Sequence, residues 1–306
     1  MLSGIGPQKE LKKRHISVVM DLPGVGRNLQ NHVGAAIVAG KSAHPVYKKP
    51  LDRQDEVDFD FKKAGPLTFS AANGLGMTTT PDSANDQDVR IRMTIAGYSS
   101  NPNGSIEPGH LRQAHTRDGL LNVDIIALLP VVAAPKSRGY LKLASNRIQD
   151  LPKINPKYLS RSDDRKLARQ GVQLALRFMN TKAFQVLHLK RLDPDYRKMC
   201  RTFVQDSDDY LDCIIRTYSE SENHYACTCK MGSVNDTMAV LDSNLRVRGV
   251  QGLRVVDASV MPQITRANPN IPVVMIAEKA SDMIKAEYGM ISVSPILRPE
   301  FDARIL

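Results

Sequence analysis

Three segments between residues 89 and 143 have the composition of β-strands and are separated by turn-forming residues. Residues 89–95 alternate apolar and polar side chains, the pattern of a strand with one buried face. Residues 121–132 form a longer apolar run with Val and Ile, as expected for a more deeply buried strand. Residues 139–143 alternate again after a turn over residues 135–138. Several strands with turns between them predict an antiparallel sheet.

Three helices are predicted after these strands. The first begins at Ser162, because residues 162–164 supply a capping side chain and negative charge for the N-terminal end of the helix dipole. Apolar or small residues then recur at helical spacing and would form one buried face: Leu167, Gly171, Leu174, Ala175 and Phe178. The other two helices are expected over residues 207–218 and 272–285.

The first part of the chain combines a short predicted strand with a turn rich in glycine. Residues 16–20 are suited to a strand, and residues 21–26 contain two glycines. Glycine permits a positive φ or a close approach of two backbones, so we expect a tight turn at this point. A compact extended segment is expected to follow over residues 27–33.

A possible ligand-binding edge lies before the last predicted helix. Residues 253–256 are predicted to form a short buried strand that ends at Asp257, followed by Ala258. Such an ending can place a carboxylate and free backbone N–H groups at the edge of a sheet where ligands bind. The helix that begins near Pro272 can direct its N-terminus toward a polar or anionic group. The same features are also common without a ligand, and residues 268–270 can be an ordinary turn.

His224 is a candidate base. It precedes small and polar residues, so its imidazole is expected to be accessible. An unperturbed pKa of about 6.5 suits proton abstraction at neutral pH. A single histidine is nevertheless more often structural than catalytic. The residues alone therefore predict an enzyme-like α/β domain and no particular reaction.

The chain carries a formal net charge of +10, but its basic residues are scattered in short groups. There is no Trp, and aromatic residues make up 5% of the chain, so basic patches interleaved with stacking side chains are missing. We expect a mildly basic, solvated surface and no nucleic-acid partner. No run approaches the roughly 18 consecutive apolar residues of a membrane helix. The first residues lack the basic and apolar regions of a signal peptide. We therefore expect neither a membrane-spanning helix nor a signal peptide.

Four cysteines are present, in two arrangements. Cys200 and Cys213 flank a short polar loop that can return on itself, so we expect them to lie close enough for a disulfide in an oxidising compartment. Cys227 and Cys229 form a C-x-C, which is not the C-x-x-C of zinc or redox sites. They are expected to be buried single thiols, and no metal site is expected.

Two segments together resemble the carboxy-terminal signature of a known enzyme family. His224 stands five residues before the cysteine of a T-C-K-M-G run. Asn268 stands eleven residues beyond Asp257, the aspartate of a V-D-A-S run. This order and spacing is similar to that of the glucose–methanol–choline (GMC) oxidoreductases, in which those two positions are catalytic and the second is a His or an Asn.

Further segments extend the resemblance from residue 1 to about residue 288. Residues 3–7 are similar to the end of the family's second signature, and residues 21–30 to the segment that follows it. Residues 135–140 and 210–213 resemble the insect glucose-dehydrogenase-like branch of the family most.

The resemblance implies an α+β fold in two parts. Residues 45–215 would form an antiparallel-sheet substrate domain with helices. Residues 1–44 would be a remnant of an α/β flavin-binding domain with a lid-like segment. Residues 216–290 would hold the catalytic segment and the carboxy-terminal part of that flavin domain, so they are expected to pack against residues 1–44. Residues 291–306 are expected to be a poorly ordered tail.

The resemblance also implies FAD as the cofactor and an alcohol or sugar as the substrate. His224 would accept the hydroxyl proton while hydride leaves the α-carbon, and Asn268 would hydrogen-bond the same oxygen, so the two side chains are expected to converge. An oxygen or quinone acceptor would reoxidise the flavin. Localisation is left open, with an extracellular full-length parent as one option. The residues expected to contact the cofactor are Asp257, Ala258, Pro269 and Asn270.

The chain departs from the family pattern in several places. The G-x-G-x-x-G nucleotide fingerprint is absent from the sequence, and in the family it lies in an amino-terminal half that this chain lacks. Cys227 replaces the usual Gly, as in some choline-dehydrogenase-like members, and Tyr225 replaces Pro. Asn31 replaces the Asp that usually precedes the residue at His32. The alternative function is therefore an inactive truncated product or an interaction protein without bound flavin.

Overall fold

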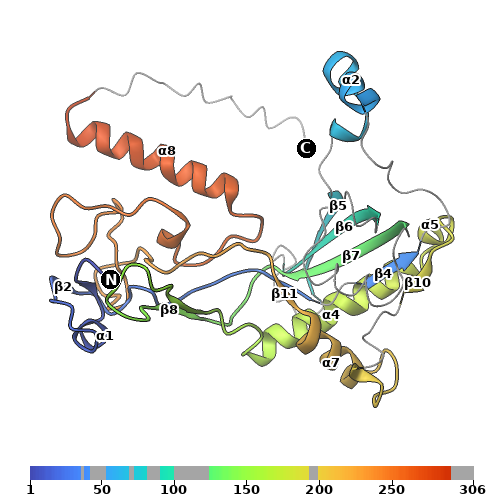
Figure 1. Cartoon of the computed structure of the whole chain (residues 1–306), viewed down its shortest axis with the longest axis horizontal. Helices are drawn as coiled ribbons and strands as arrows, with labels where there is room; N and C mark the ends of the chain where they lie inside the picture. Colours follow the sequence, from blue (N-terminus) through green and yellow to red (C-terminus); the bar gives the residue numbers. More distant parts are fainter. Residues whose placement is uncertain are drawn as a thin grey trace. The chain divides into compact units, whose positions relative to one another are not determined.

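The computed structural model describes residues 1–35, 38–41, 53–68, 72–80, 90–99, 124–192 and 199–290 (Figure 1). Contacts between Cα atoms divide the chain into two compact units. Unit 1 comprises Met1–Gln30, Arg138–Pro156 and Tyr225–Leu306. Unit 2 comprises Asn31–Ser137 and Lys157–His224.

These units differ in their boundaries from the segments drawn from the sequence. Residues 31–44 and 216–224 group with the sheet of unit 2, and residues 138–156 group with unit 1. The assignment of roles to the segments stays a prediction. The expected tail, residues 291–306, lies outside the described residues.

Unit 2 is built on an antiparallel sheet of seven strands among the described residues. β7 is its central strand, with β6 along one edge and β3 and β4 along the other. The strands are β3 (Val33–Gly34), β4 (Val38–Lys41), β5 (Ala72–Thr78), β6 (Ile91–Ser99), β7 (Asp124–Val132), β10 (Lys190–Leu192) and β11 (Glu220–Ser221). The predicted antiparallel sheet is confirmed, and β6 and β7 are the strands expected over residues 89–95 and 121–132.

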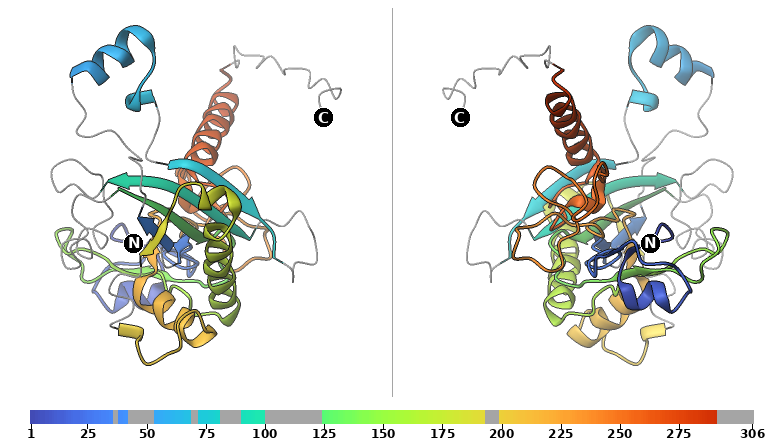
Figure 2. Two further views of the ribbon diagram at one scale, coloured as in Figure 1. Left: turned by 90° about the vertical axis from the view of Figure 1, so that its right-hand side faces the viewer. Right: turned by 90° about the vertical axis from the view of Figure 1, so that its left-hand side faces the viewer.

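Helix α4 (Ser162–Met179) covers one face of this sheet by packing on β4, β6 and β7 (Figure 2). Gly171 permits the close approach, because a Cβ added there would meet Pro130 Cβ at 2.9 Å. Most of the predicted helix face is buried or half-buried, but Phe178 is 40% exposed and does not belong to it. The buried residues of the face are Leu167, Ala168, Gly171, Val172 and Ala175.

The N-terminus of α4 differs from the prediction. The capping position is held by Arg161, and Ser162 is already helical, so no side chain caps the helix. Asp164 instead accepts hydrogen bonds from the backbone N–H groups of Lys136 and Ser137, each at 2.7 Å. The acidic first turn therefore holds the turn that follows β7.

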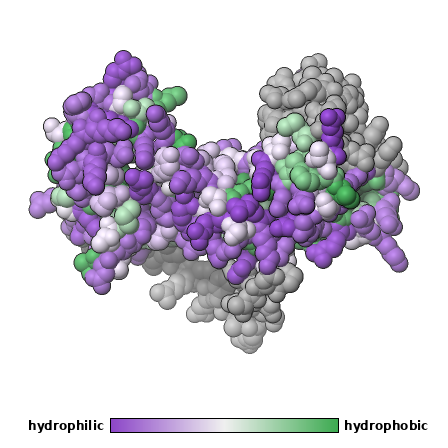
Figure 3. Space-filling model, turned by 90° about the horizontal axis from the view of Figure 1, so that it is seen from below, coloured by the Kyte–Doolittle hydropathy of each residue, from purple (hydrophilic) through white to green (hydrophobic). Residues whose placement is uncertain are grey.

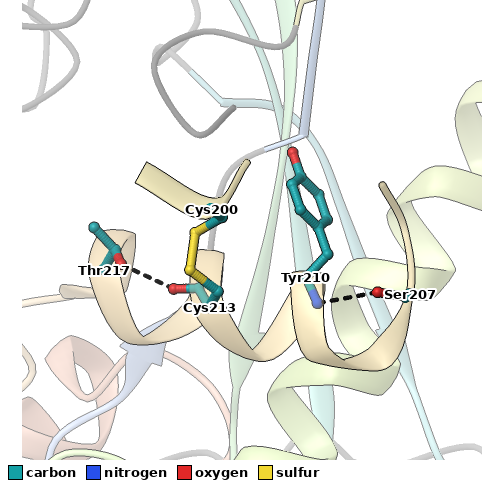
Figure 4. Close-up of a disulfide and its surroundings, with 5 residues drawn as sticks. All are labelled: Cys200, Ser207, Tyr210, Cys213 and Thr217. Carbon is teal, nitrogen blue, oxygen red and sulfur yellow. Dashed lines mark hydrogen bonds between the residues drawn. A yellow bond between two sulfur atoms is a disulfide. The ribbon is translucent and has the colours of Figure 1, made fainter. Parts of the chain in front are cut away.

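Helix α7 (Asp208–Tyr218) packs on α4 and begins as predicted. The side chain of Ser207 caps it by accepting the N–H of Tyr210 (Figure 4). A disulfide joins Cys200 and Cys213, whose Cα atoms are 5.9 Å apart, so the predicted pairing is confirmed. The remaining helical segments of unit 2 are α2 (Arg53–Lys62), η1 (Pro66–Thr68) and α5 (Lys182–Gln185).

Unit 1 contains little regular structure apart from one long helix. Its elements are β1 (Ile5–Gly6), α1 (Gln8–Lys12), β2 (Met20–Asp21), β8 (Tyr140–Lys142), β9 (Lys153–Asn155), η2 (Ala258–Val260) and α8 (Asn270–Glu287). β8 is the strand predicted over residues 139–143, and α8 extends the helix predicted over residues 272–285 by two residues at each end.

Distant segments of the chain are joined within unit 1. The N–H of Gly26 donates to the carbonyl of Thr228, and Gln30 and Ala226 exchange backbone hydrogen bonds. The amide of Asn28 donates to the carbonyls of Cys227 and Pro262. These bonds agree with the expectation that the first and last parts of the chain pack together.

The turn over residues 21–26 has both features that its glycines predict, a positive φ and a close approach of two backbones. Gly26 has a φ of +77°, which glycine adopts without strain. At Gly24 an added Cβ would lie 2.1 Å from the carbonyl oxygen of Met238, so this position needs glycine for a close backbone approach.

Two predicted strands of unit 1 are not formed. Of residues 16–20 only Met20 is in a strand, which pairs in parallel with β1. Residues 253–256 do not form a buried strand, because Arg254 makes only an isolated bridge to Arg246 and Leu253 is 39% exposed. A strand requires a ladder of bonds to its neighbour, and the described residues supply one bridge.

The surface agrees with the expected solvated character. The face shown in Figure 3 is mainly hydrophilic, with hydrophobic side chains in small groups. Among the described residues, no helix has the length and apolar character needed to cross a bilayer. No cluster of candidate metal ligands occurs in that part of the chain either.

Candidate active site

A pair of histidines lies beside the β3–β11 pairing of unit 2. His224 follows β11, and His32 directly precedes β3. Their Nδ1 atoms are 3.0 Å apart, a hydrogen-bond distance, and the rings meet edge to face at 84°. His32 is fully buried, whereas His224 is half-buried. His224 is thus the member of the pair that solvent or a ligand can reach.

The antiparallel register brings the two histidines together. Ser221 pairs with Val33, so residues 222–224 run back along residues 31–32. The backbone pairing continues beyond the strands, because the N–H of Glu222 donates to the carbonyl of His32 at 3.3 Å.

Asn31 fixes the backbone of His224 through its side chain. Its Oδ1 accepts the N–H of His224 at 2.8 Å. Its Nδ2 donates to Ser221 Oγ at 2.9 Å and to the hydroxyl of Tyr158. The amide is therefore engaged on both sides, and its orientation is determined by these partners.

A buried ion pair lies next to the histidines. Arg92 of β6 donates to Glu222 at 2.6 Å, and both side chains are largely shielded from solvent. Burial lowers the pKa of Arg92 and raises the pKa of Glu222, and each partner opposes the shift of the other. The pair keeps a positive charge close to His224.

The pKa of His224 is lowered from its ordinary value, first by burial and second by the positive charge of Arg92. The imidazole is therefore neutral at neutral pH, and a neutral imidazole has a lone pair that can accept a proton. Among the described residues, no hydrogen bond to Nε2 of His224 is formed. The ring thus has one nitrogen bound to His32 and one available.

Asp257 and Ala258 lie at the start of η2 in unit 1. The Asp257 carboxylate is exposed and caps η2, with Oδ1 accepting the N–H of Ser259 at 2.7 Å. The Ala258 carbonyl accepts the N–H groups of Cys227 and Met261. These local bonds leave Oδ2 of Asp257 available, and they replace the strand end expected from the sequence.

The N-terminus of α8 carries the other predicted cofactor residues. Pro269 is its capping residue and Asn270 its first helical residue, and no side chain caps the helix. The N–H groups of Asn270 and Ile271 have no acceptor among the described residues, and the first turn contains no acidic residue. Such an end of a helix of 18 residues favours an anionic or polar partner.

His224 and Asn268 belong to different units, His224 to unit 2 and Asn268 to unit 1. Asn268 is exposed and directly precedes the capping residue of α8. Their expected convergence on one oxygen stays a prediction.

The two free thiols differ in burial. Cys227 is fully buried, and burial raises its pKa to about 12. Cys229 is only half-buried, contrary to the expectation, and burial raises its pKa as well. Both are therefore protonated at neutral pH and unsuited to act as thiolate nucleophiles.

Sequence reasoning did not find three neighbours of His224. His32 drew attention only through the substitution at Asn31 beside it, and Arg92 and Glu222 drew none. Arg92 occupies a polar position in the alternating residues 89–95, so the alternation does not indicate that its charge is buried beside Glu222.

The fold and the site together define an α+β protein with a neutral, accessible histidine at the edge of an antiparallel sheet. Residues 135–277 match the family model described as GMC oxidoreductase, in its carboxy-terminal part. These residues carry the carboxy-terminal domain of the GMC oxidoreductases, and the predicted α+β fold is confirmed.

Individual relatives support this assignment. The chain is 34% identical over 292 residues to glucose dehydrogenase (FAD, quinone) of Drosophila pseudoobscura pseudoobscura, covering 94% of this chain and 45% of the relative. It is 34% identical to the mitochondrial choline dehydrogenase of Homo sapiens, covering 95% and 46%. The predicted likeness to insect glucose dehydrogenases is confirmed. The chain spans about half the length of the curated relatives it matches.

Solved structures show the same fold. Formate oxidase of Aspergillus oryzae matches with a TM-score of 0.76 at 21% identity, over 94% of this chain and 52% of that protein. Pyridoxine 4-oxidase from "Mesorbium loti" matches with a TM-score of 0.69 at 24% identity, over 93% and 48%.

Proposed function

We propose that this chain is the substrate-domain half of an FAD-dependent oxidoreductase that acts on the CH–OH group of an alcohol or sugar. The observation that carries the proposal is the state of His224. Its imidazole is kept neutral by burial and by Arg92, and Nε2 has no hydrogen-bond partner among the described residues. This is the state required of a general base.

The chain's own residues have defined roles in this reaction. Nε2 of His224 accepts the hydroxyl proton of the substrate, which develops negative charge on the oxygen and so activates the adjacent C–H bond. Asn268 donates a hydrogen bond to the same oxygen and holds its position. FAD supplies the acceptor for the hydride that leaves the α-carbon.

The residues of unit 1 fit the polar parts of such a cofactor. Oδ2 of Asp257 can accept a hydroxyl of the ribityl chain. The free N–H groups at the start of α8, beside Pro269 and Asn270, suit an anionic or carbonyl group. Ala258 contributes a small side chain that lets a ligand approach its backbone.

The partner half would bind the ADP part of the cofactor. Two observations support this: the chain spans about half the length of its curated relatives, and its sequence contains no G-x-G-x-x-G. Oxidoreductase activity then belongs to the full-length parent rather than to these residues alone.

The final electron acceptor is oxygen or a quinone. The names of the relatives include both a glucose dehydrogenase (FAD, quinone) and an oxygen-dependent choline dehydrogenase. Hydrogen peroxide formation in air identifies an oxidase, whereas turnover that needs an added quinone identifies a dehydrogenase.

An oxidising compartment, such as the extracellular space, is proposed for the full-length parent. The Cys200–Cys213 disulfide supports this, because structural disulfides persist mainly in secreted proteins.

The test compares His224→Asn with His15→Asn in the full-length parent. His15 is an exposed histidine with a positive φ that asparagine accepts, so it is a matched control. His224→Asn should lower kcat by about 10²–10⁴-fold with flavin still bound, because a positioned base contributes this much. His15→Asn should retain full activity.

Two outcomes would reject the proposal. Unchanged turnover in His224→Asn would remove this residue from the mechanism. A parent protein without the absorbance bands of flavin would favour the alternative, an inactive product or an interaction protein.

A further inference from the structure

A short turn leads from β11 to His224. β11 ends at Ser221, and Asn223 has a φ of +57°, in the left-handed region that few residues other than glycine adopt. The N–H of Asn223 donates to Ser221 Oγ at 3.0 Å. The position of the His224 backbone therefore depends on the conformation of this turn.

The side-chain amide of Asn31 joins the two ends of the turn. Its Oδ1 accepts the N–H of His224 at 2.8 Å, and its Nδ2 donates to Ser221 Oγ at 2.9 Å. Asn31 is only 3% exposed, so water does not compete for these bonds. One buried side chain thus holds the residue before the turn and the residue after it.

The orientation of this amide follows from its partners. A backbone N–H can only donate, so the amide atom that faces His224 must be the oxygen. The nitrogen then faces the hydroxyls of Ser221 and Tyr158, each of which can accept. Tyr158 packs against the apolar core of unit 2, so the amide is anchored to that core as well as to the turn.

The sheet holds the backbone on which Asn31 lies. Val33, two residues further on, pairs with Val132 of β7 and with Ser221 of β11. The carbonyl of His32 accepts the N–H of Glu222. Asn31 therefore acts on His224 from a segment that is already fixed on both sides.

We propose that Asn31 is a positioning residue, whose amide oxygen holds the backbone of His224 where the imidazole can take a proton from the substrate. This inference rests on the proposed function of His224. A base works only within hydrogen-bond reach of the proton that it takes. A histidine side chain has two rotatable bonds, so the place of its backbone largely sets where the ring nitrogens can lie.

The proposed role requires an acceptor oxygen at residue 31, and two substitutions isolate this requirement. Asn31→Leu fills similar space and removes the oxygen. Asn31→Asp keeps an oxygen for the N–H of His224, and the hydroxyls of Ser221 and Tyr158 can turn to donate to a carboxylate. The two variants therefore separate the hydrogen bond from the space that the side chain fills.

The first measurement is hydrogen exchange at the His224 amide in the full-length parent, resolved by fragmentation mass spectrometry. Exchange should be slow in the unsubstituted protein and in Asn31→Asp, and faster in Asn31→Leu. Ser221→Ala leaves the acceptor of His224 in place, so it should keep most of the protection. Asn146→Leu makes the same change at an exposed asparagine between β8 and β9 and should alter nothing.

The second measurement is the dependence of kcat on pH. Asn31→Leu should lower kcat about tenfold to a hundredfold at every pH with flavin bound, because a small displacement of a catalytic group costs this much. KM should change little, since Asn31 is buried. Asn31→Asp should regain nearly full kcat at high pH, where His224 is neutral. His32, Arg92 and Glu222 near His224 are the same in both variants, so the recovery reports the oxygen at residue 31.

A folded Asn31→Leu with unchanged kcat would overturn the inference, whatever its hydrogen exchange. If Asn31→Leu does not fold, Asn31→Asp decides. Loss of protection at the His224 amide in that variant, or a kcat that stays low at high pH, overturns the inference, whereas protection with recovered kcat supports it. If His224→Asn retains turnover, the proposed function itself fails, and the exchange measurement still shows whether Asn31 holds the backbone of His224.

Discussion

At the scale of single residues, the surroundings of His224 include a positive charge, and position 31 beside it carries a neutral amide in place of a carboxylate. His224 contacts the ring of His32 and lies close to the charge of Arg92, and its backbone is held by the neutral amide of Asn31. An aspartate usually stands at the position of Asn31 in the family. The amide keeps the hydrogen bond to His224 while omitting the negative charge.

Asn31→Asp should therefore raise the pKa of His224. A carboxylate close to an imidazole favours the imidazolium, with shifts of about 1–3 units for charges within a few ångströms. Because the base must be neutral, the acidic limb of the kcat/KM profile should move to higher pH. NMR titration of His224 measures the shift. Asn223→Asp is the control, since residue 223 is exposed and its charge is screened. A pKa that does not rise in Asn31→Asp would contradict this account.

The Arg92–Glu222 pair makes a second prediction at this scale. Arg92→Met should destabilise unit 2 by about 3–5 kcal/mol, because it leaves a buried carboxylate without its partner. The double variant Arg92→Met with Glu222→Leu should lose less than the single variant. Removal of Arg92 should also raise the pKa of His224, since its charge lowers that pKa. Denaturant unfolding measures the stabilities. A double variant less stable than Arg92→Met would show that the uncompensated charge is not the cause.

At the scale of elements, the sequence predicted the start of a helix correctly where the capping side chain belongs to the helix itself. Ser207 caps α7 as its position suggests, by accepting the N–H of Tyr210 at 3.2 Å. Ser162 does not cap α4, and Asp164 turns to the segment after β7. The difference arises because that segment offers two backbone N–H groups to Asp164, a tertiary contact that local sequence does not reveal.

Two serines at the ends of α7 allow a matched test. Ser207→Ala should cost about 1 kcal/mol, because one N–H at the start of the helix loses its acceptor. Ser219→Ala should be neutral or slightly stabilising, because Ser219 Oγ is buried and has no hydrogen-bond partner within the described segments. Thermal unfolding of both variants measures the difference. Equal losses would show that the cap of α7 does not contribute.

At the scale of the whole molecule, the described chain consists of two units with different kinds of core. Unit 2 buries apolar side chains between its sheet and helices α4 and α7, and it carries the disulfide and His224. Unit 1 has a second apolar cluster built mainly from irregular segments at the two ends of the chain. Closure of the loop between Cys200 and Cys213 adds a constraint to unit 2 alone.

Reduction of this disulfide should lower the stability of unit 2. Closing a loop of this length stabilises a fold by about 3 kcal/mol, chiefly by restricting the unfolded chain. The melting temperature should fall when reductant is added. A variant with Cys200→Ser and Cys213→Ser should melt at the lower temperature and respond to reductant no further. A large response in that variant would implicate Cys227 or Cys229 instead.

The sequence by itself determined the elements that depend on neighbouring residues. Alternation and apolar runs identified β6 and β7, helical spacing identified most of the buried face of α4, and a short polar loop identified the Cys200–Cys213 pair. The V-V-D-A-S segment shows the limit of this reasoning. Its composition suits a buried strand, but strand formation depends on a partner that only the fold can supply.

Only the tertiary structure decided what surrounds His224. His32 is 192 residues away in sequence, and Arg92 meets Glu222 across 130 residues. These contacts follow from the register of β3 with β11 and from the position of β6 in the sheet. Local periodicity determines which face of a strand is buried but not which distant strand lies beside it. The motif therefore predicted the histidine, and the pairing of strands determined its ring partner and the lowering of its pKa.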